Sequence, residues 1–162
     1  MDLFSSGYAC VWRIGRAPLR IHWTTPIGFF LLSGMSFNPL VWAALFGIMI
    51  VHELGHALLA RRYGLRLVSI DITGVGGVCR LEGDPTLREA AIVAWGGVLA
   101  QAALAVVTLV VRGILSVVAF GLLDGMFDTL ITSNLILIGI NLLPIHPLDG
   151  KTAWRLFGDA SK

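Results

Sequence analysis

One nearly continuous apolar stretch, residues 40–60, contains a single group of ionisable side chains, the motif His52-Glu-Leu-Gly-His56. An apolar run of about 20 residues is typical of a helix that crosses a membrane. Ionisable groups are costly in a bilayer, so within such a helix they mark a functional site by default. The motif therefore predicts a chemical site inside a membrane span.

Composition supports a membrane protein. The 162 residues are 56% hydrophobic and 14% charged, with a mean hydropathy of +0.82, whereas soluble domains average about 25% charged residues. The length allows about four spans. Cys10 and Cys79 are too few for a disulfide framework. Because no phosphate-binding loop, dinucleotide fingerprint or basic–aromatic patch is present, we expect no nucleic-acid partner. The fold class that this predicts is an all-α polytopic membrane protein.

Proline and glycine signals divide the chain into four expected spans, at about 20–37, 40–62, 87–111 and 127–145. Gly64 is a plausible cap for the second span. Thr86 and Glu89 have the spacing of a capping box at the start of the third. Residues 114–123 are apolar but too few to cross, so we expect an interfacial or re-entrant segment. The resulting organisation is a lead-in over 1–19, a transmembrane core over 20–150 and a short basic tail over 151–162.

Residues 65–82 change to a period of two, which predicts a small re-entrant β-hairpin between the second and third spans. Such a hairpin must be buried against protein or line a wet cavity. We hypothesise that its first strand, 66–73, offers an edge to which an extended substrate adds. The expected substrate-binding residues here are Ile70, Ile72, Gly74, Gly76 and Gly77.

Charge predicts the orientation. Four spans place both termini on one side, together with every Lys and Arg except Arg112. By the positive-inside rule that side is cytoplasmic, which predicts a multi-pass protein of the cell membrane. His52 then lies roughly 13 Å from the cytoplasmic end of its helix.

The His-Glu-x-x-His spacing predicts a zinc site. On a helix, residues four apart share a face, so His52 and His56 can bind one Zn²⁺ while Glu53, turned roughly 100° away, acts as general base on the zinc-bound water. A catalytic zinc usually takes three protein ligands. Asp149 is the expected third ligand, because Asp124 and Asp128 fall on the side opposite the histidines. His146 stays open as an alternative.

Two motifs together resemble those of the site-2 protease family of intramembrane zinc metalloproteases. They are His52-Glu-Leu-Gly-His56 and Asn141-Leu-Leu-Pro144-Ile-His-Pro147-Leu-Asp-Gly150. Ile21-His-Trp23 and the glycine-rich hairpin are similar to the family as well, and the resemblance covers about residues 18–157. The compact form is similar to the bacterial branch that processes sporulation sigma factors.

The resemblance implies hydrolysis of a peptide bond within or next to a transmembrane segment of a membrane-tethered protein. It implies one Zn²⁺ per chain, with Glu53 as base and Asn141 positioning substrate or stabilising the oxyanion. Pro144 and Pro147 are expected to contact substrate. The implied partners are the lipid bilayer, a single-pass or membrane-associated substrate such as a tethered transcription or sigma factor or its regulator, and a separate regulatory membrane protein.

The chain departs from the family pattern where Gly97-Val-Leu-Ala-Gln101 replaces Gly-Pro-Leu-x-Asn and where Lys151 replaces a second glycine. Three other functions compete with cleavage of a transmembrane substrate. A membrane zinc protease that trims prenylated C-termini would need a glutamate ligand from a later helix, and Glu82 and Glu89 are not so placed. A scaffold has no need of the four site residues together, and a metal transporter should carry polar residues along several spans.

Overall fold

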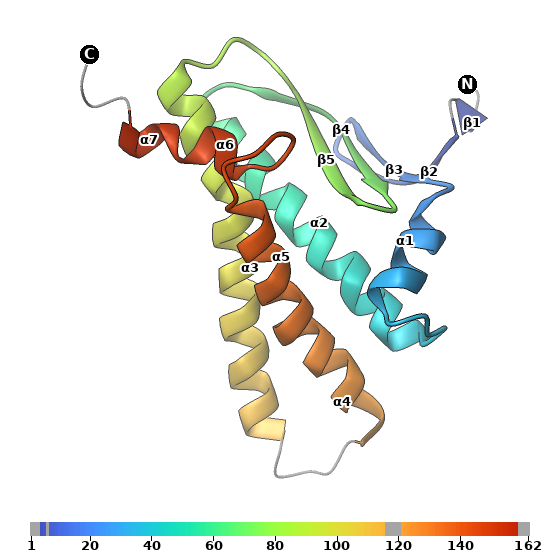
Figure 1. Cartoon of the computed structure of the whole chain (residues 1–162). Helices are drawn as coiled ribbons and strands as arrows, with labels where there is room; N and C mark the ends of the chain where they lie inside the picture. Colours follow the sequence, from blue (N-terminus) through green and yellow to red (C-terminus); the bar gives the residue numbers. More distant parts are fainter. Residues whose placement is uncertain (1–3, 6, 116–120, 159–162) are drawn as a thin grey trace.

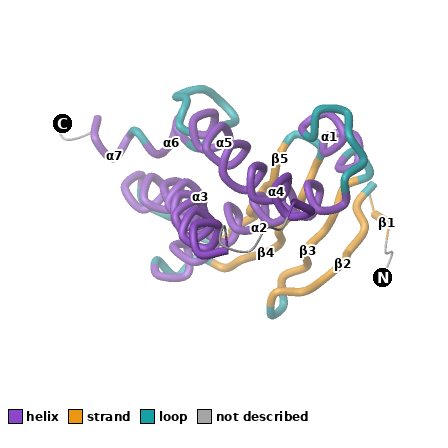
Figure 2. The backbone as a smooth tube through the Cα atoms, turned by 90° about the horizontal axis from the view of Figure 1, so that it is seen from below, coloured by secondary structure: helices purple, strands orange, loops and turns teal. Residues whose placement is uncertain are grey.

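The computed structural model describes residues 4–5, 7–115 and 121–158. Long helical segments stand side by side, with a β-sheet beside the upper part of helix α2 (Pro39–Arg62) (Figure 1). In the perpendicular view the strands form one side of the molecule, and α2 lies between them and helix α3 (Leu87–Leu115) (Figure 2). Strand β1 (Phe4–Ser5) and helix α7 (Arg155–Gly158) both lie toward the upper end in Figure 1.

Within the described residues, three helical segments are long and apolar enough to cross a membrane. They are α2, α3 and the continuous run of α4 (Gly121–Asp128), the π-helical turn η1 (Thr129–Ser133) and α5 (Asn134–Asn141), of which Leu123–Asn141 meets the criterion. The outer face of α3 exposes large apolar side chains such as Leu99, Val106 and Val110. Such a surface suits contact with lipid.

The ends of these helices follow the expected signals. Gly64 adopts φ 72° after α2, and the Leu65 and Gly64 amides donate to the carbonyls of Ala60 and Arg61, which is a Schellman motif. At the start of α3 the Thr86 amide donates to Glu89 Oε2 at 2.8 Å, and the Glu89 amide donates to Thr86 Oγ1 at 3.3 Å. The predicted capping box is therefore confirmed.

The expected first span, 20–37, is wrong. Its beginning belongs to strand β3 (Ala17–His22), and its helical part, α1 (Thr25–Leu32), has only eight residues. Such a helix is about 12 Å long and cannot cross a bilayer. The reason is that residues 17–22 pair with strands on both sides, which fixes them in an extended conformation.

The all-α expectation also needs correction, because the described residues include a five-stranded sheet of order β1-β2-β3-β4-β5. It contains the predicted hairpin, β4 (Arg66–Thr73) and β5 (Gly76–Glu82), and a second hairpin formed by β2 (Tyr8–Ile14) and β3. β3 and β4 are parallel, with Leu19 opposite Ile70 and Ile21 opposite Ile72. β4 is thus an inner strand, and the free edge predicted for it belongs to β5 instead.

The inner face of the sheet packs on α2 and α1. The buried side chains of Leu19, Phe29, Leu45, Met49, Ile70 and Ile72 form one apolar cluster. Gly28 and Gly74 are in backbone contact, since a Cβ on Gly28 would lie 1.8 Å from the Gly74 carbonyl oxygen. The hairpin beside the site is therefore held by both α1 and α2.

An ionic cluster joins the two hairpins on the other face of the sheet. The carboxylate of Asp71, which has no exposed surface, accepts from Arg20 Nε at 2.7 Å and from Arg80 Nε at 2.7 Å. Arg20 also donates to Ser69 Oγ at 3.1 Å. Burial raises the pKa of Asp71, but the two guanidinium groups outweigh burial and hold that pKa below its usual value.

We expect Asp71→Asn to lower the free energy of unfolding by about 2 kcal/mol or more, because charge-assisted hydrogen bonds to a buried group are lost. The pKa is lowered on folding, so this stabilisation is present above the unfolded value near 3.8 and is lost as pH falls below it. Thermal unfolding of both forms in detergent at pH 7 and below pH 4 measures this. The control is Glu82→Gln, which breaks an exposed pair with Arg66 and should cost less than about 1 kcal/mol. Equal stability of Asp71→Asn and wild type at pH 7 would contradict the expectation.

Two expectations remain untested. The centre of the expected interfacial segment 114–123 lies outside the described residues. The division into lead-in, core and tail stays a prediction, although its boundaries fall within β3 and within α6 (Gly150–Ala153).

Candidate metal centre

Close packing of α2 on α3 builds the framework of the site. A Cβ on Gly55 would lie 2.2 Å from the Gly96 carbonyl oxygen, and one on Gly96 would lie 2.5 Å from that of Gly55. The two backbones therefore touch at this crossing, because glycine on both helices leaves no side chain between them. His52 and His56 stand one turn apart on α2 beside this contact.

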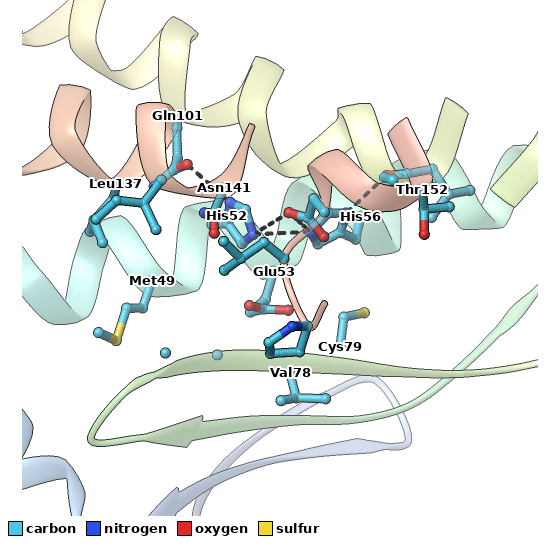
Figure 3. Close-up of a pocket in the computed structure, with 18 of the residues that line it drawn as sticks. Met49, His52, Glu53, His56, Val78, Cys79, Gln101, Leu137, Asn141 and Thr152 are labelled. Carbon is cyan, nitrogen blue, oxygen red and sulfur yellow. Dashed lines mark hydrogen bonds and ion pairs between the residues drawn. The ribbon is translucent and has the colours of Figure 1, made fainter. Parts of the chain in front are cut away.

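The two imidazoles converge on one carboxylate. His52 Nε2 lies 3.0 Å and His56 Nε2 lies 3.2 Å from Asp149 Oδ2, and the two Nε2 atoms are 3.0 Å apart. Asp149 precedes α6, in the segment that follows α5. These residues form a group of three ligand side chains that could hold one metal ion. Figure 3 shows the two histidines side by side on α2.

Each imidazole is oriented by an oxygen at its other nitrogen. His52 Nδ1 lies 3.0 Å from Gln101 Oε1, and His56 Nδ1 lies 2.8 Å from the Val93 carbonyl oxygen. A carbonyl only accepts, so each Nδ1 carries the proton and donates it, and each Nε2 keeps its lone pair toward Asp149. This is the arrangement of a metal-binding histidine with an outer hydrogen-bond partner.

The donor set fits a zinc ion. Asp149 Oδ2 is buried and has no hydrogen-bond donor among the described residues, which a cation between the three atoms would correct. Ligands at zinc distances of about 2.0–2.2 Å in a tetrahedron lie roughly 3.3 Å apart, close to the separations found here.

Glu53 lies between α2 and the free-edge strand β5 (Figure 3). Only 2% of it is exposed. Its carboxylate is hydrogen-bonded to the Cys79 backbone, and a Cβ on Gly77 would lie 2.3 Å from Glu53 Oε1. Because residue 77 is glycine, the Glu53 carboxylate has room at this position. The carboxylate lies beside the two histidines but is not one of the three candidate metal ligands.

The candidate metal ligands and Glu53 line an open cavity of about 510 Å³. Of the residues predicted from sequence, it is lined by His52, Glu53, His56, Gly76, Gly77, Asn141, Pro147 and Asp149. Ile70 and Ile72 do not line it, because their side chains are fully buried in the core. Gly74 packs against Thr24 and Gly28, and Pro144 lies outside the cavity lining. His146 is exposed and is not in the metal-binding group.

Cys79 also lines the cavity. Burial, with a further contribution from the charge of Glu53, raises the pKa of its thiol to about 12. The thiol is therefore neutral at physiological pH, and a neutral thiol is a poor nucleophile and a poor metal ligand.

Sequence reasoning missed Gln101 as a partner of His52, and the structure predicts a consequence. We expect Gln101→Leu to weaken zinc binding by about 10–100-fold, because the buried His52 Nδ1–H loses its acceptor. Competition with a chelator in detergent measures the dissociation constant. Thr108→Val, which removes another buried polar group of α3 bonded only within its helix, should leave it unchanged. Unaltered zinc affinity in Gln101→Leu would contradict this role.

Among the described residues, the fold and the site combine three candidate membrane spans with a His-His-Asp group that could hold a metal ion. The sequence model of peptidase family M50 matches residues 40–122, and the chain belongs to this family. A zinc metalloprotease of Methanocaldococcus jannaschii is 31% identical over 151 residues, which is 90% of this chain and 44% of that protein. Rip3 of Mycobacterium tuberculosis, named as a candidate zinc metalloprotease, is 33% identical over 69% of this chain and 30% of its own length.

A solved structure has a similar fold. The site-2 protease from Methanocaldococcus jannaschii superposes with a TM-score of 0.71 at 25% identity, covering 93% of this chain and 71% of that one. The chain spans less than half the length of the curated relatives it matches. Family membership and the resemblance stated from the motifs therefore agree.

Proposed function

We propose that this chain is an intramembrane zinc metalloprotease of the site-2 type. One observation carries the proposal. Three ligand atoms converge at 3.0–3.2 Å on a candidate membrane span, with Glu53 beside them and facing the same cavity. The names of the relatives, which describe zinc metalloproteases, support the same activity.

The roles of the residues follow from their positions. His52, His56 and Asp149 would hold the zinc, which when bound lowers the pKa of a water molecule and polarises a carbonyl. Glu53 accepts a proton on its carboxylate and later passes it to the leaving amine. Asn141, at the end of α5 and on the cavity wall, orients the substrate or donates to the developing oxyanion.

The substrate we propose is an extended segment of a single-pass or membrane-associated protein. A helical peptide bond is shielded by its own hydrogen bonds, so the segment must unwind. β5 supports this idea, because it is the edge of the sheet and its residues 76–79 line the cavity. Addition of the substrate to β5 places a peptide bond beside Glu53, and the space beside Gly76, with no atom within 4 Å of an added Cβ, leaves room for it.

Charge supports the proposed orientation in the cell membrane. Arg61 and Arg62 end α2, Arg66 begins β4, and Lys151 and Arg155 lie in α6 and α7, at the same end as the sheet (Figure 1). Arg112 lies near the other end of α3 and pairs with Asp128 at the end of α4. We propose that the sheet end and the zinc are toward the cytoplasm.

A tethered transcription or sigma factor, or its regulator, is the proposed substrate, with a separate membrane protein as regulator.

The test is cleavage of a single-pass test protein in liposomes. The proposal predicts that a chelator stops cleavage, that Zn²⁺ restores it, and that mass spectrometry locates the cut within or next to the transmembrane segment. Cleavage that persists after zinc removal, or cuts only in soluble loops, would overturn it.

A further inference from the structure

The carboxylate of Asp149 stands on a segment with little regular structure. α5 ends at Asn141 and α6, which has four residues, begins at Gly150, so Asp149 and the residues before it lie outside regular helix. Yet Asp149 Oδ2 is held at 3.0 and 3.2 Å from two imidazoles on another helix. Other contacts must therefore hold this backbone.

Two indole N–H groups supply such contacts. Trp154 Nε1 donates to the Leu142 carbonyl at 2.7 Å, which joins the residue after α6 to the residue after α5 and closes the segment that carries Asp149. Trp95 Nε1, on α3, donates to the Ala153 carbonyl at 3.1 Å and ties α6 to α3.

Both indoles belong to one aromatic cluster. The ring centroids of Trp95 and Trp154 are 5.5 Å apart at 81°, and Phe157 packs on both, at 6.1 and 6.0 Å. The cluster is linked to the candidate metal centre along α3. Val93, whose carbonyl accepts from His56, stands two residues before Trp95. Gly97, whose Cβ would touch both imidazoles, stands two residues after it.

We propose that Trp95 and Trp154 are positioning residues for the third metal ligand. Their N–H groups hold the backbone around Asp149 before the metal binds, so that the carboxylate meets His52 and His56 without first being ordered. This inference rests on the proposed function, because it takes Asp149 as a zinc ligand. It assigns the two tryptophans a role in metal affinity that neither motif indicates.

The test uses Trp95→Phe and Trp154→Phe in the full chain in detergent. Each keeps an aromatic ring and removes one donor. Chelator competition should show zinc binding weakened by about 10–100-fold in each variant, as for other outer partners of metal ligands. Trp12→Phe, at a position 70% exposed on β2, is the matched control and should bind zinc like wild type.

A double-mutant cycle separates positioning from a general loss of structure. If Trp154 acts through Asp149, then adding Trp154→Phe to Asp149→Ala should not weaken zinc binding further. Unchanged zinc affinity in both single tryptophan variants, or a full additional loss in the Asp149→Ala background, would overturn the inference while leaving the ligand set intact. Zinc affinity that survives Asp149→Ala itself would overturn the ligand set and the inference with it.

Discussion

Replacement of Glu53 by Gln should reduce peptide hydrolysis by about 10²–10⁴-fold while one zinc ion stays bound. Glutamine has the same shape and can still accept from the Cys79 backbone, the contact that Glu53 makes. It cannot accept a proton at neutral pH, so the substitution removes the general base and leaves the shape of the side chain unchanged. Zinc should remain because the converging ligand atoms come from His52, His56 and Asp149. Initial rates on a single-pass substrate, with metal content measured on the same sample, test this.

The control for this experiment is Glu82→Gln, which removes a glutamate from β5 that pairs with Arg66 on the exposed sheet. It should cleave at the wild-type rate. Retained cleavage in zinc-replete Glu53→Gln would show that another group takes the proton.

Replacement of Gly97 by Ala should remove the metal centre through a single methyl group. The added Cβ would lie 2.5 Å from both His52 Cε1 and His56 Nε2. Carbon does not approach ring atoms so closely, so the imidazoles must move apart and the triangle of ligand atoms is lost. We expect zinc affinity to fall by about 100-fold or more, because the first-shell ligands themselves are displaced. Alanine favours a helix over glycine by about 1 kcal/mol, so unfolding is not the expected cause.

Gly47→Ala is the matched control, since Gly47 lies on α2 with nothing within 4 Å of its added Cβ. Zinc affinity measured for both variants should separate them clearly. Similar zinc affinity in Gly97→Ala and Gly47→Ala would mean that the histidines are not packed against α3 as described.

Local signals in the sequence were sufficient for the parts of the site that lie close together along the chain. The spacing of His52 and His56 specifies one helix face, and the period of two over 65–82 specifies the hairpin that the structure contains. Thr86 with Glu89 and Gly64 specify helix ends because each makes its hydrogen bonds within one turn.

Features that depend on contacts between distant segments were missed. β3 pairs with β4 some 50 residues later, and Pro18 within β3 argues locally against a strand. Arg20 and His22 are signals against a span that begins at residue 20, because charged groups enter a bilayer at high cost. In the sequence, Gln101 stands out only as a departure from the family pattern. Its role follows from the closeness of α2 and α3 at Gly55 and Gly96, which no local pattern specifies.

We expect His52, His56 and Asp149 to bind one zinc ion together. The most direct measurement is the zinc content of purified wild-type protein and Asp149→Ala, each checked for unchanged folding. We expect one zinc per chain in wild type and its loss in the variant. Full zinc retention in Asp149→Ala would contradict it and would direct attention to His146, the other candidate for the third ligand.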